Sequence, residues 1–247
     1  GETIFDGDES IRKRPVNHVV EALSQLGAEC FTEDELNKYC PLHVKGIDCT
    51  QNKNHSVTTA GEISSQYITG IMLAATRLNG TTQINLTNPK ETPYLTMTQK
   101  WLEKVNVKTD ISPDYKKITV EGPVNIKAFE TTIPSDWEAV AFPLVAALLT
   151  DSEITITDID GSGTQGDDAI VGVLKSLGAD IEWNREAKTI TVRGGKKARN
   201  GTGRLSTENL EGNELHVNLS GYPDALCAMA VAACFTEGTV YFEDLSV

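Results

Sequence analysis

Three stretches of the chain share one pattern, in which a nearly uninterrupted apolar helix precedes a strand of alternating polar and apolar residues. They cover residues 64–86, 136–159 and 223–245. Alternation with a period of two is typical of a half-buried strand. A helix that is apolar on every side favours a position inside a domain core. We therefore expect buried helices that lie under sheets.

A second pattern alternates with the first. Residues 22–28 (ALSQLGA), 101–107 (WLEKVNV) and 173–179 (VLKSLGA) are interpreted as ends of amphipathic helices, and two of the three carry the glycine that favours a helix stop. Short strands separated by polar turns follow each of them. The combined unit of helix, strand, strand, helix and strand recurs about every 70–80 residues, which is too long for a helical solenoid. It predicts an α/β (α+β) protein with internal pseudo-symmetry.

The repeats also suggest how the chain is organised. The first unit begins at a strand-like TIFDG and the last stops after its strand, so we expect a segment of a larger protein. The proline-containing stretch 131–136 (TTIPSD) separates one repeat from the next. This predicts two domains, residues 1–133 and 134–247.

Composition narrows the classes of function. The 247 residues are 39% hydrophobic and 23% charged, without an apolar run of the roughly 20 residues that span a bilayer. With 22 basic and 35 acidic residues the formal net charge is −13, which argues against nucleic-acid and anionic-membrane surfaces. Five cysteines without zinc-site spacing, and a charged N-terminus, predict free thiols in a reducing cytoplasm and no metal.

Two stretches suggest candidate chemistry. Ser64-Ser65-Gln66 stands at the predicted start of an apolar helix, where hydroxyl groups cap free N–H groups and where anions bind. An ordinary N-cap and a site for a phosphorylated, hydroxylated ligand are both open interpretations. The stretch 161–168 (GSGTQGDD) lacks the Lys-Ser/Thr of a phosphate-binding P-loop, so we interpret it as a turn that caps the next helix.

Five blocks of sequence then resemble one family in order and spacing. They are FDGDESIRKRPVNHVVEALSQLGA, GEISSQYITGIMLAA, PYLTMTQKWLEK, GTQGDDAIVGVLKSLGA and YPDALCAMAVAACF. Together they resemble 5-enolpyruvylshikimate-3-phosphate synthases over nearly the whole chain. The resemblance implies the enolpyruvyl transferase fold, with two domains each built of βαβαββ units. It also implies transfer of the enolpyruvyl group from phosphoenolpyruvate to the 5-hydroxyl of shikimate 3-phosphate, with release of phosphate and without a metal or organic cofactor.

The resemblance also implies roles for particular residues. Arg14 of the KRP motif matches the arginine that holds the phosphoenolpyruvate carboxylate, a task that suits a planar guanidinium. Ser64, Ser65 and Gln66 match residues that bind the shikimate phosphate and bridge the two substrates. A surface arginine and a helix cap are the structural alternatives.

Two further residues are carried over in the same way. Tyr94 matches a tyrosine that lines the shikimate site, with a core tyrosine as the alternative. Asp224 of YPDA matches the carboxylate that contacts the 5-hydroxyl and serves in proton transfer, since burial and nearby charge can shift the pKa of a carboxylate. A helix N-cap is the alternative for Asp224.

The chain departs from the family pattern in several places. Glu91 stands where a serine that touches the shikimate is usual, and Asp136-Trp137-Glu138-Ala139 replaces Asp-x-Ser-Ser-Ala. The N-terminal and C-terminal blocks of the family, with much of its positive charge and its second acid–base carboxylate, are not in this sequence. A non-catalytic relative or inactive fragment that only binds ligand is therefore a second hypothesis.

Two related families are weighed against this one. UDP-N-acetylglucosamine enolpyruvyl transferases carry a reactive cysteine five residues before the same Arg-Pro, where this chain has Glu9. RNA 3′-phosphate cyclases share the repeats but need basic, nucleotide-binding features that this sequence lacks. We expect a cytoplasmic monomer that binds shikimate 3-phosphate and phosphoenolpyruvate, with glyphosate as an inhibitor and without a nucleic-acid or membrane partner.

Overall fold

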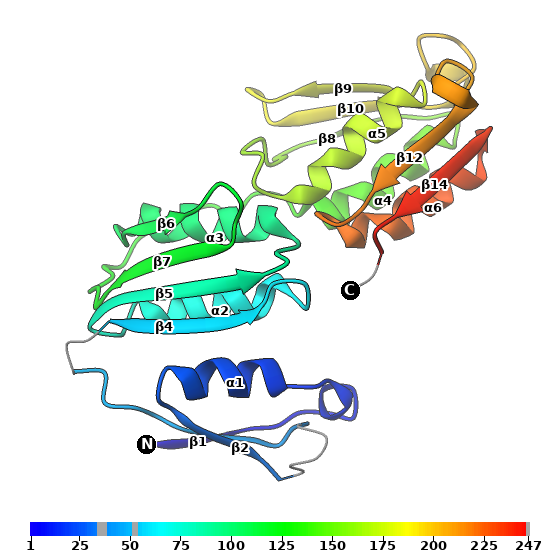
Figure 1. Cartoon of the computed structure of the whole chain (residues 1–247). Coiled ribbons are helices and arrows are strands. Elements are labelled where there is room, and N and C mark those ends of the chain that lie inside the picture. The colour runs from blue at the N-terminus through cyan, green and yellow to red at the C-terminus, as the bar shows by residue number, and fades with distance from the viewer. Residues whose placement is uncertain (34–38, 51–53, 246–247) are drawn as a thin grey trace. The chain divides into compact units, whose positions relative to one another are not determined.

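The chain divides into two compact units, Gly1–Ala128 and Phe129–Val247. The computed structural model in Figure 1 describes residues 1–33, 39–50 and 54–245. Each unit encloses its own cluster of buried apolar side chains. The division falls in residues 123–136, which form neither helix nor strand, and the boundary expected at 133/134 lies in the same segment.

The first unit contains two sheets covered by helices (Figure 1). The smaller sheet is antiparallel in the order β1 (Glu2–Phe5), β3 (Leu42–Lys45), β2 (Glu29–Thr32). The larger sheet has the order β4 (His55–Ala60), β5 (Gly80–Thr87), β7 (Lys117–Gly122), β6 (Thr109–Ile111). The helical elements are η1 (Ile11–Lys13), α1 (Asn17–Gln25), α2 (Ser65–Ala75) and α3 (Thr92–Lys104). Strands β4 to β7 with α2 and α3 thus form one complete βαβαββ unit, in which β4 and β5 run parallel.

Helix α1 packs against both sheets of the first unit. Its last residue, Gln25, accepts a hydrogen bond from the backbone N–H of Thr58 (2.8 Å) and donates one to the Thr58 carbonyl (3.0 Å). Thr58 lies on β4, an edge strand of the larger sheet, whose outer backbone groups need partners. The side chain of Gln25 therefore covers part of that edge and holds α1 against it.

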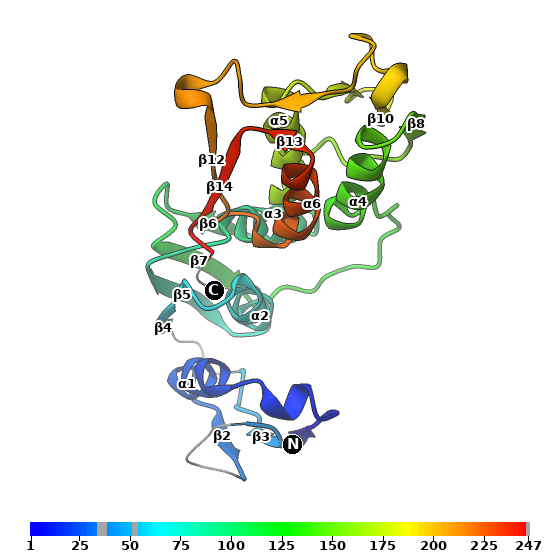
Figure 2. The same cartoon turned by 90° about the vertical axis from the view of Figure 1, so that its right-hand side faces the viewer.

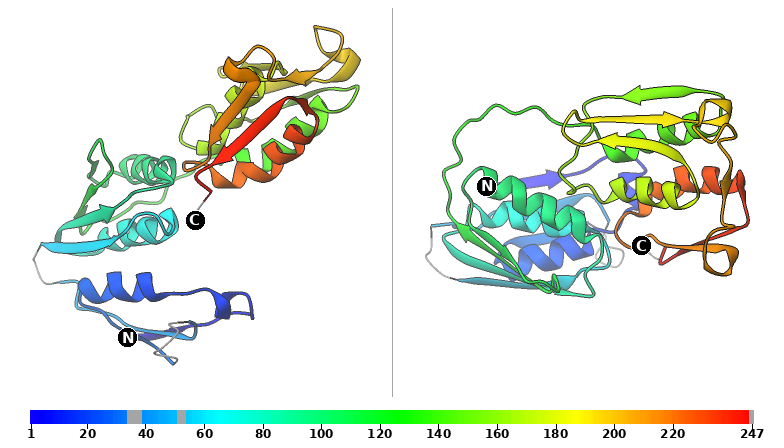
Figure 3. Two further views of the ribbon diagram at one scale, coloured as in Figure 1. Left: turned by 45° about the vertical axis from the view of Figure 1, so that its right-hand side comes forward. Right: turned by 90° about the horizontal axis from the view of Figure 1, so that it is seen from above.

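The second unit repeats this plan. Figure 3 shows the antiparallel sheet β8 (Glu153–Ile156), β10 (Thr189–Arg193), β9 (Asp180–Asn184) with α4 (Trp137–Leu148) and α5 (Ile170–Ser176) on one face. Two parallel pairs follow, β12 (Glu214–Asn218) with β14 (Thr239–Glu243) and β11 (Leu205–Ser206) with β13 (Thr236–Glu237). Helix α6 (Leu226–Cys234) lies beside α4 in Figure 2. The short 3₁₀ helices of this unit are η2 (Gly166–Ala169), η3 (Gly195–Lys197), η4 (Glu211–Asn213) and η5 (Pro223–Ala225).

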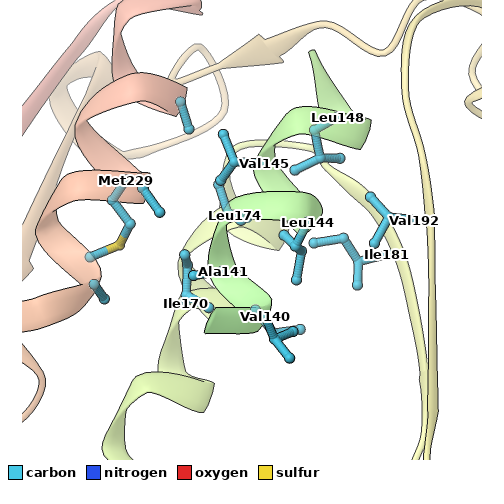
Figure 4. Packing of buried hydrophobic residues seen from close by; sticks show 14 of the residues in the cluster. Val140, Ala141, Leu144, Val145, Leu148, Ile170, Leu174, Ile181, Val192 and Met229 are labelled. Carbon is cyan, nitrogen blue, oxygen red and sulfur yellow. The ribbon is translucent and has the colours of Figure 1, made fainter. Parts of the chain in front are cut away.

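The core of the second unit is built around α4. In Figure 4, Leu144 of α4 lies near Ile181 and Val192 of the sheet, and Val145 of the same helix lies toward Met229 of α6. All of these side chains are at most 3% exposed. Because α4 packs against the sheet on one side and α6 on another, its sequence is apolar around most of its circumference.

The burial of the apolar helices is nevertheless incomplete, because each has one exposed side. Leu73 on α2 and Phe142 on α4 are each 52% exposed, and Val231 on α6 is 49% exposed. The α/β class with helices under sheets is confirmed, but each of these helices also presents an apolar side chain outward. None of the helices in the described parts of the chain combines the length and the apolar character required to cross a bilayer.

The repeat is visible in individual hydrogen bonds at three helix ends. After α1, α3 and α5 the chain turns through a left-handed residue, Gly27 (φ 100°), Asn106 (φ 62°) and Gly178 (φ 92°). In each case the next N–H returns to a leucine carbonyl of the helix, with lengths of 3.0, 2.9 and 3.1 Å. This is the Schellman ending, and asparagine replaces glycine in the middle copy because it also tolerates that conformation. The three helix ends expected from sequence are therefore equivalent in structure.

Candidate functional site

The turn between β4 and α2 forms the centre of the candidate site in the first unit. Ser64 has an extended backbone (φ −171°, ψ 136°), and its Oγ accepts a hydrogen bond from the N–H of Gln66 (3.2 Å). The expected N-cap is therefore present. Ser65 is only 5% exposed whereas Gln66 is exposed. The three residues thus differ in what they offer a ligand, since Ser65 faces protein and Gln66 faces solvent.

The carboxylate of Glu91 binds the start of α2. Its Oε2 accepts hydrogen bonds from the backbone N–H of Ser65 (2.9 Å) and from the Ser65 hydroxyl (2.7 Å). An anion at a helix N-terminus is stabilised by the unpaired N–H groups and by the helix dipole. A side chain of the protein itself therefore holds the donors that the sequence suggested for a ligand phosphate.

The β4–α2 and β5–α3 loops approach closely enough to bring Glu91 to this position. Gly61 donates its N–H to the carbonyl of Thr87 (2.7 Å), and its own carbonyl accepts from Lys90 (3.0 Å). A Cβ atom on Gly61 would lie 2.7 Å from Cα of Pro89, so only glycine fits here. Glu91 follows as the N-cap of α3 in the left-handed conformation (φ 50°, ψ 35°).

Tyr94 lies in the first turn of α3, one turn after Glu91. It is half-buried, and its backbone N–H donates to the carbonyl of Glu91 (3.1 Å). The two loops thus bring Ser64, Ser65, Gln66 and Tyr94 into one region of the first unit. Glu91, which the sequence marks only as a departure, is the residue that joins them.

Arg14 lies on the segment that enters α1. It is exposed and extended (φ −91°, ψ 127°) directly after η1. The next residue, Pro15, accepts a hydrogen bond through its carbonyl from the hydroxyl of Tyr67 (3.3 Å), which stands in the first turn of α2. This bond places the Arg14 segment beside the same helix start as Ser64 to Gln66.

The neighbouring cations of the KRP motif have acidic partners. Arg12 forms a two-pronged ion pair with Asp6, and the Nζ of Lys13 lies 3.7 Å from a carboxylate oxygen of Glu9. The Arg12 guanidinium lowers the pKa of Asp6 to about 2. Both side chains are exposed, so Arg12 and Lys13 are surface neighbours of Arg14.

Asp224 belongs to the second unit, where it lies exposed in η5 just before α6. Loss of hydration raises the pKa of Glu138 in the first turn of α4, and the negative charges of Asp224, Asp136 and Asp167 raise it further. Carboxylates from three separate segments therefore share one acidic region around the N-termini of α4, η2 and η5. Their grouping depends on the fold, so the sequence alone contains no signal for it.

Trp137 and the loop 161–168 have structural roles. Trp137 is 1% exposed, its Nε1 donates to the carbonyl of Asp160 (2.9 Å), and its ring meets Trp183 edge-on. Its backbone N–H donates to Oε1 of Gln165 (2.8 Å). The loop therefore caps the preceding helix α4, and the expectation that it caps the next helix is wrong: Gln165 makes no side-chain cap bond to η2.

In the described residues, no group of three or more His, Cys, Asp or Glu is arranged so that it could hold a metal ion. What the first unit offers a ligand is instead an exposed guanidinium, hydroxyl and amide groups at a helix start, and a tyrosine. Groups of this kind recognise carboxylates, phosphates and hydroxyls.

Comparisons with known proteins agree on one family. The model described as EPSP synthase (3-phosphoshikimate 1-carboxyvinyltransferase) matches residues 1–247. The 3-phosphoshikimate 1-carboxyvinyltransferase of Ruminiclostridium cellulolyticum is 33% identical over 238 residues, covering 96% of this chain and 51% of that protein. The protein of the same name from Methanosarcina acetivorans is 34% identical over 248 residues, covering 99% of this chain and 53% of that protein. The chain thus spans about half the length of the curated relatives it matches.

Solved structures give the same result for the fold. EPSP synthase from Acinetobacter baumannii superposes with a TM-score of 0.71 at 21% identity, over 98% of this chain and 51% of that one. The enolpyruvyl transferase NikO from Streptomyces tendae gives a TM-score of 0.70 at 15% identity, over 98% of this chain and 53% of that one. At these identities the likeness concerns the fold alone.

Proposed function

The chain belongs to the EPSP synthase family, and on this basis we propose that it takes part in enolpyruvyl transfer from phosphoenolpyruvate to the 5-hydroxyl of shikimate 3-phosphate. In the proposed reaction the 5-hydroxyl oxygen adds to C2 of phosphoenolpyruvate while a proton adds to C3. The tetrahedral intermediate then loses a proton from the new methyl group and expels phosphate. The double bond of the enolpyruvyl ether forms in this second step.

The observation that carries the proposal is the arrangement around the start of α2. Ser64 and Gln66 lie at the N-terminus of a helix that also anchors the Arg14 segment through the Tyr67–Pro15 hydrogen bond. We assign Arg14 to the carboxylate of phosphoenolpyruvate, because its guanidinium is charged at any working pH and binds a carboxylate with two parallel bonds. Ser64, Ser65 and Gln66 are assigned to the shikimate phosphate, and Tyr94 to the ring.

Asp224 is assigned to proton transfer at the 5-hydroxyl. A carboxylate within hydrogen-bond reach of a hydroxyl can accept its proton, and Asp224 is exposed in η5, where a ligand can approach it. The acidic region around Glu138 disfavours the binding of a further anion beside it. The positive charge that binds phosphoenolpyruvate is therefore assigned to Arg14 and to parts of the family pattern outside this sequence.

Calorimetric titration with shikimate 3-phosphate tests the proposal directly. We expect saturable binding that weakens by about 1–3 kcal/mol in Gln66→Ala and in Asp224→Asn, because each variant loses a hydrogen-bond partner of the ligand. Asp110→Asn, an exposed aspartate on β6, removes the same charge away from the site and serves as the matched control. Absence of heat and of competition at millimolar ligand in the wild type would contradict the proposal.

A phosphate-release assay with phosphoenolpyruvate and shikimate 3-phosphate then separates turnover from binding. Phosphate release that stops in Asp224→Asn supports catalysis by this chain, and binding without release supports the hypothesis of a ligand-binding relative. Glyphosate is proposed to compete with phosphoenolpyruvate on the Arg14 side. The monomeric state, the absence of nucleic-acid and membrane partners and the cytoplasmic location stay predictions.

A further inference from the structure

We propose that Glu91 sets the specificity of the substrate site, because its carboxylate holds the donors of Ser65 and a substrate phosphate must displace it to bind there. This inference rests on the proposed function, in which those donors receive the phosphate of shikimate 3-phosphate. One carboxylate oxygen accepts both the N–H and the hydroxyl of Ser65, at 2.9 and 2.7 Å. The position is therefore filled by an anion of the chain itself.

A phosphate and the Glu91 carboxylate cannot share these donors. Two anions at contact distance repel each other strongly where water is partly excluded, and Ser65 is 5% exposed. Binding of a phosphorylated ligand therefore requires the Glu91 side chain to rotate away and find water. A ligand without the phosphate meets no such competition, so Glu91 shifts the preference of the site from phosphorylated towards unphosphorylated ligands.

The second unit shows that capping alone does not require a negative charge. There, the first residue of α4 is Trp137, and its N–H donates to the neutral amide oxygen of Gln165 (2.8 Å). Gln165 stands directly before the next helical element η2, as Glu91 stands directly before α3. The two positions are equivalent in the repeat, and one oxygen acceptor satisfies the helix start in both. The charge of Glu91 is thus an addition to a structural role that recurs within this chain.

This equivalence supplies the test. Glu91→Gln keeps an oxygen that can cap Ser65 but removes the charge. It thereby copies the neutral glutamine cap of the second unit. Glu91→Ser also opens the position and leaves a hydroxyl. Glu103→Gln, on the exposed side of α3, removes the same charge elsewhere and is the control. Shikimate 3-phosphate and shikimate are titrated into the wild type and into each of the three variants, and circular dichroism checks that each protein is folded.

We expect both Glu91 variants to bind shikimate 3-phosphate roughly tenfold more tightly or better, with shikimate affinity changed less than about threefold. Suppose that the wild type binds shikimate 3-phosphate and that the folded Glu91→Gln variant binds it equally well or more weakly. Glu91 would then be a helix cap only. That result overturns this inference and leaves the proposed function intact. If no protein of the set binds either compound, the proposed function fails, and the inference fails with it.

Discussion

Replacing Gln165 by alanine should destabilise the second unit alone. The side chain of Gln165 bonds to three residues in two segments: Oε1 accepts from the N–H of Trp137 (2.8 Å), and Nε2 donates to the carbonyl of Ser135 and to Oδ2 of Asp160 (2.9 Å each). Alanine removes all three bonds together. It also leaves the first N–H of α4, beside the buried Trp137 side chain, without its acceptor.

The magnitude follows from these contacts. A hydrogen bond contributes about 0.5–1.5 kcal/mol net, and Gln165 is half-buried, so water replaces part of what is lost. We therefore expect a loss of about 2 kcal/mol in the free energy of unfolding of the second unit, or roughly 30-fold faster hydrogen exchange through its global opening. The variant Gln165→Glu would place a second carboxylate oxygen against two acceptors, so it should lose at least as much.

Hydrogen exchange followed by mass spectrometry is the suitable assay, because it reports on α4 and on the first unit separately. Peptides from α4 and α5 should exchange faster in Gln165→Ala, whereas peptides from α2 and α3 should not change, since the two apolar clusters are distinct. Gln66→Ala, an exposed helical position, is the control and should shift stability by less than about 0.5 kcal/mol. Equal acceleration in both units, or acceleration below about threefold in α4, would refute the reasoning.

Two further predictions concern the close loop contact at Gly61 and the stability of the protein at low pH. Gly61→Ala should destabilise the first unit by about 1–3 kcal/mol in urea unfolding, because its Cβ meets Pro89 and the Thr87 carbonyl. The control Gly70→Ala on α2 has open space and should stabilise the unit by about 0.5–1 kcal/mol. A Gly61→Ala variant with unchanged stability would contradict the close loop contact. Asp180 accepts from the Nε of Arg199 (2.8 Å), which lowers its pKa, so its contribution to stability is complete above the unfolded pKa of about 3.9 and is lost as pH falls through the lowered folded pKa. Asp180→Asn should therefore flatten the acid side of the pH–stability curve, and an unchanged curve would show that the ion pair contributes nothing there.

Much of the fold could be predicted because the relevant signals are local. Helix starts, left-handed helix ends and alternating strands depend on residues within one or two turns of each other, so Ser64 and Gly27 could be interpreted from their neighbours. The one-sided exposure of the apolar helices could not be predicted in this way. Leu73 and the buried Ile71 belong to one apolar run, and only the packing of α2 against its neighbours distinguishes them.

In the candidate site, too, the local features could be predicted from the sequence and the long-range contacts could not. The family resemblance pointed to the Ser64–Gln66 turn and to Asp224, which are sequence motifs. The hydrogen bonds of Glu91 to Ser65 span 26 positions and those of Gln165 to Trp137 span 28, so no short window contains either pair. The sequence marked Glu91 as a departure from the family, but only the structure shows that its carboxylate points at the donors of Ser65.

The repeat explains why such a departure is compatible with the fold. In both units the first N–H of a buried helix needs one oxygen acceptor from the loop before the next helix, and either glutamine or glutamate supplies it. The fold therefore constrains the position of that oxygen and leaves the charge of the side chain open. In the second unit Gln165 uses its amide nitrogen to bind Ser135 and Asp160, which requires a neutral group. Glu91 carries a charge at the equivalent position, next to the donors proposed for substrate. A single residue that the fold needs only as an acceptor can thus change which ligands the site admits.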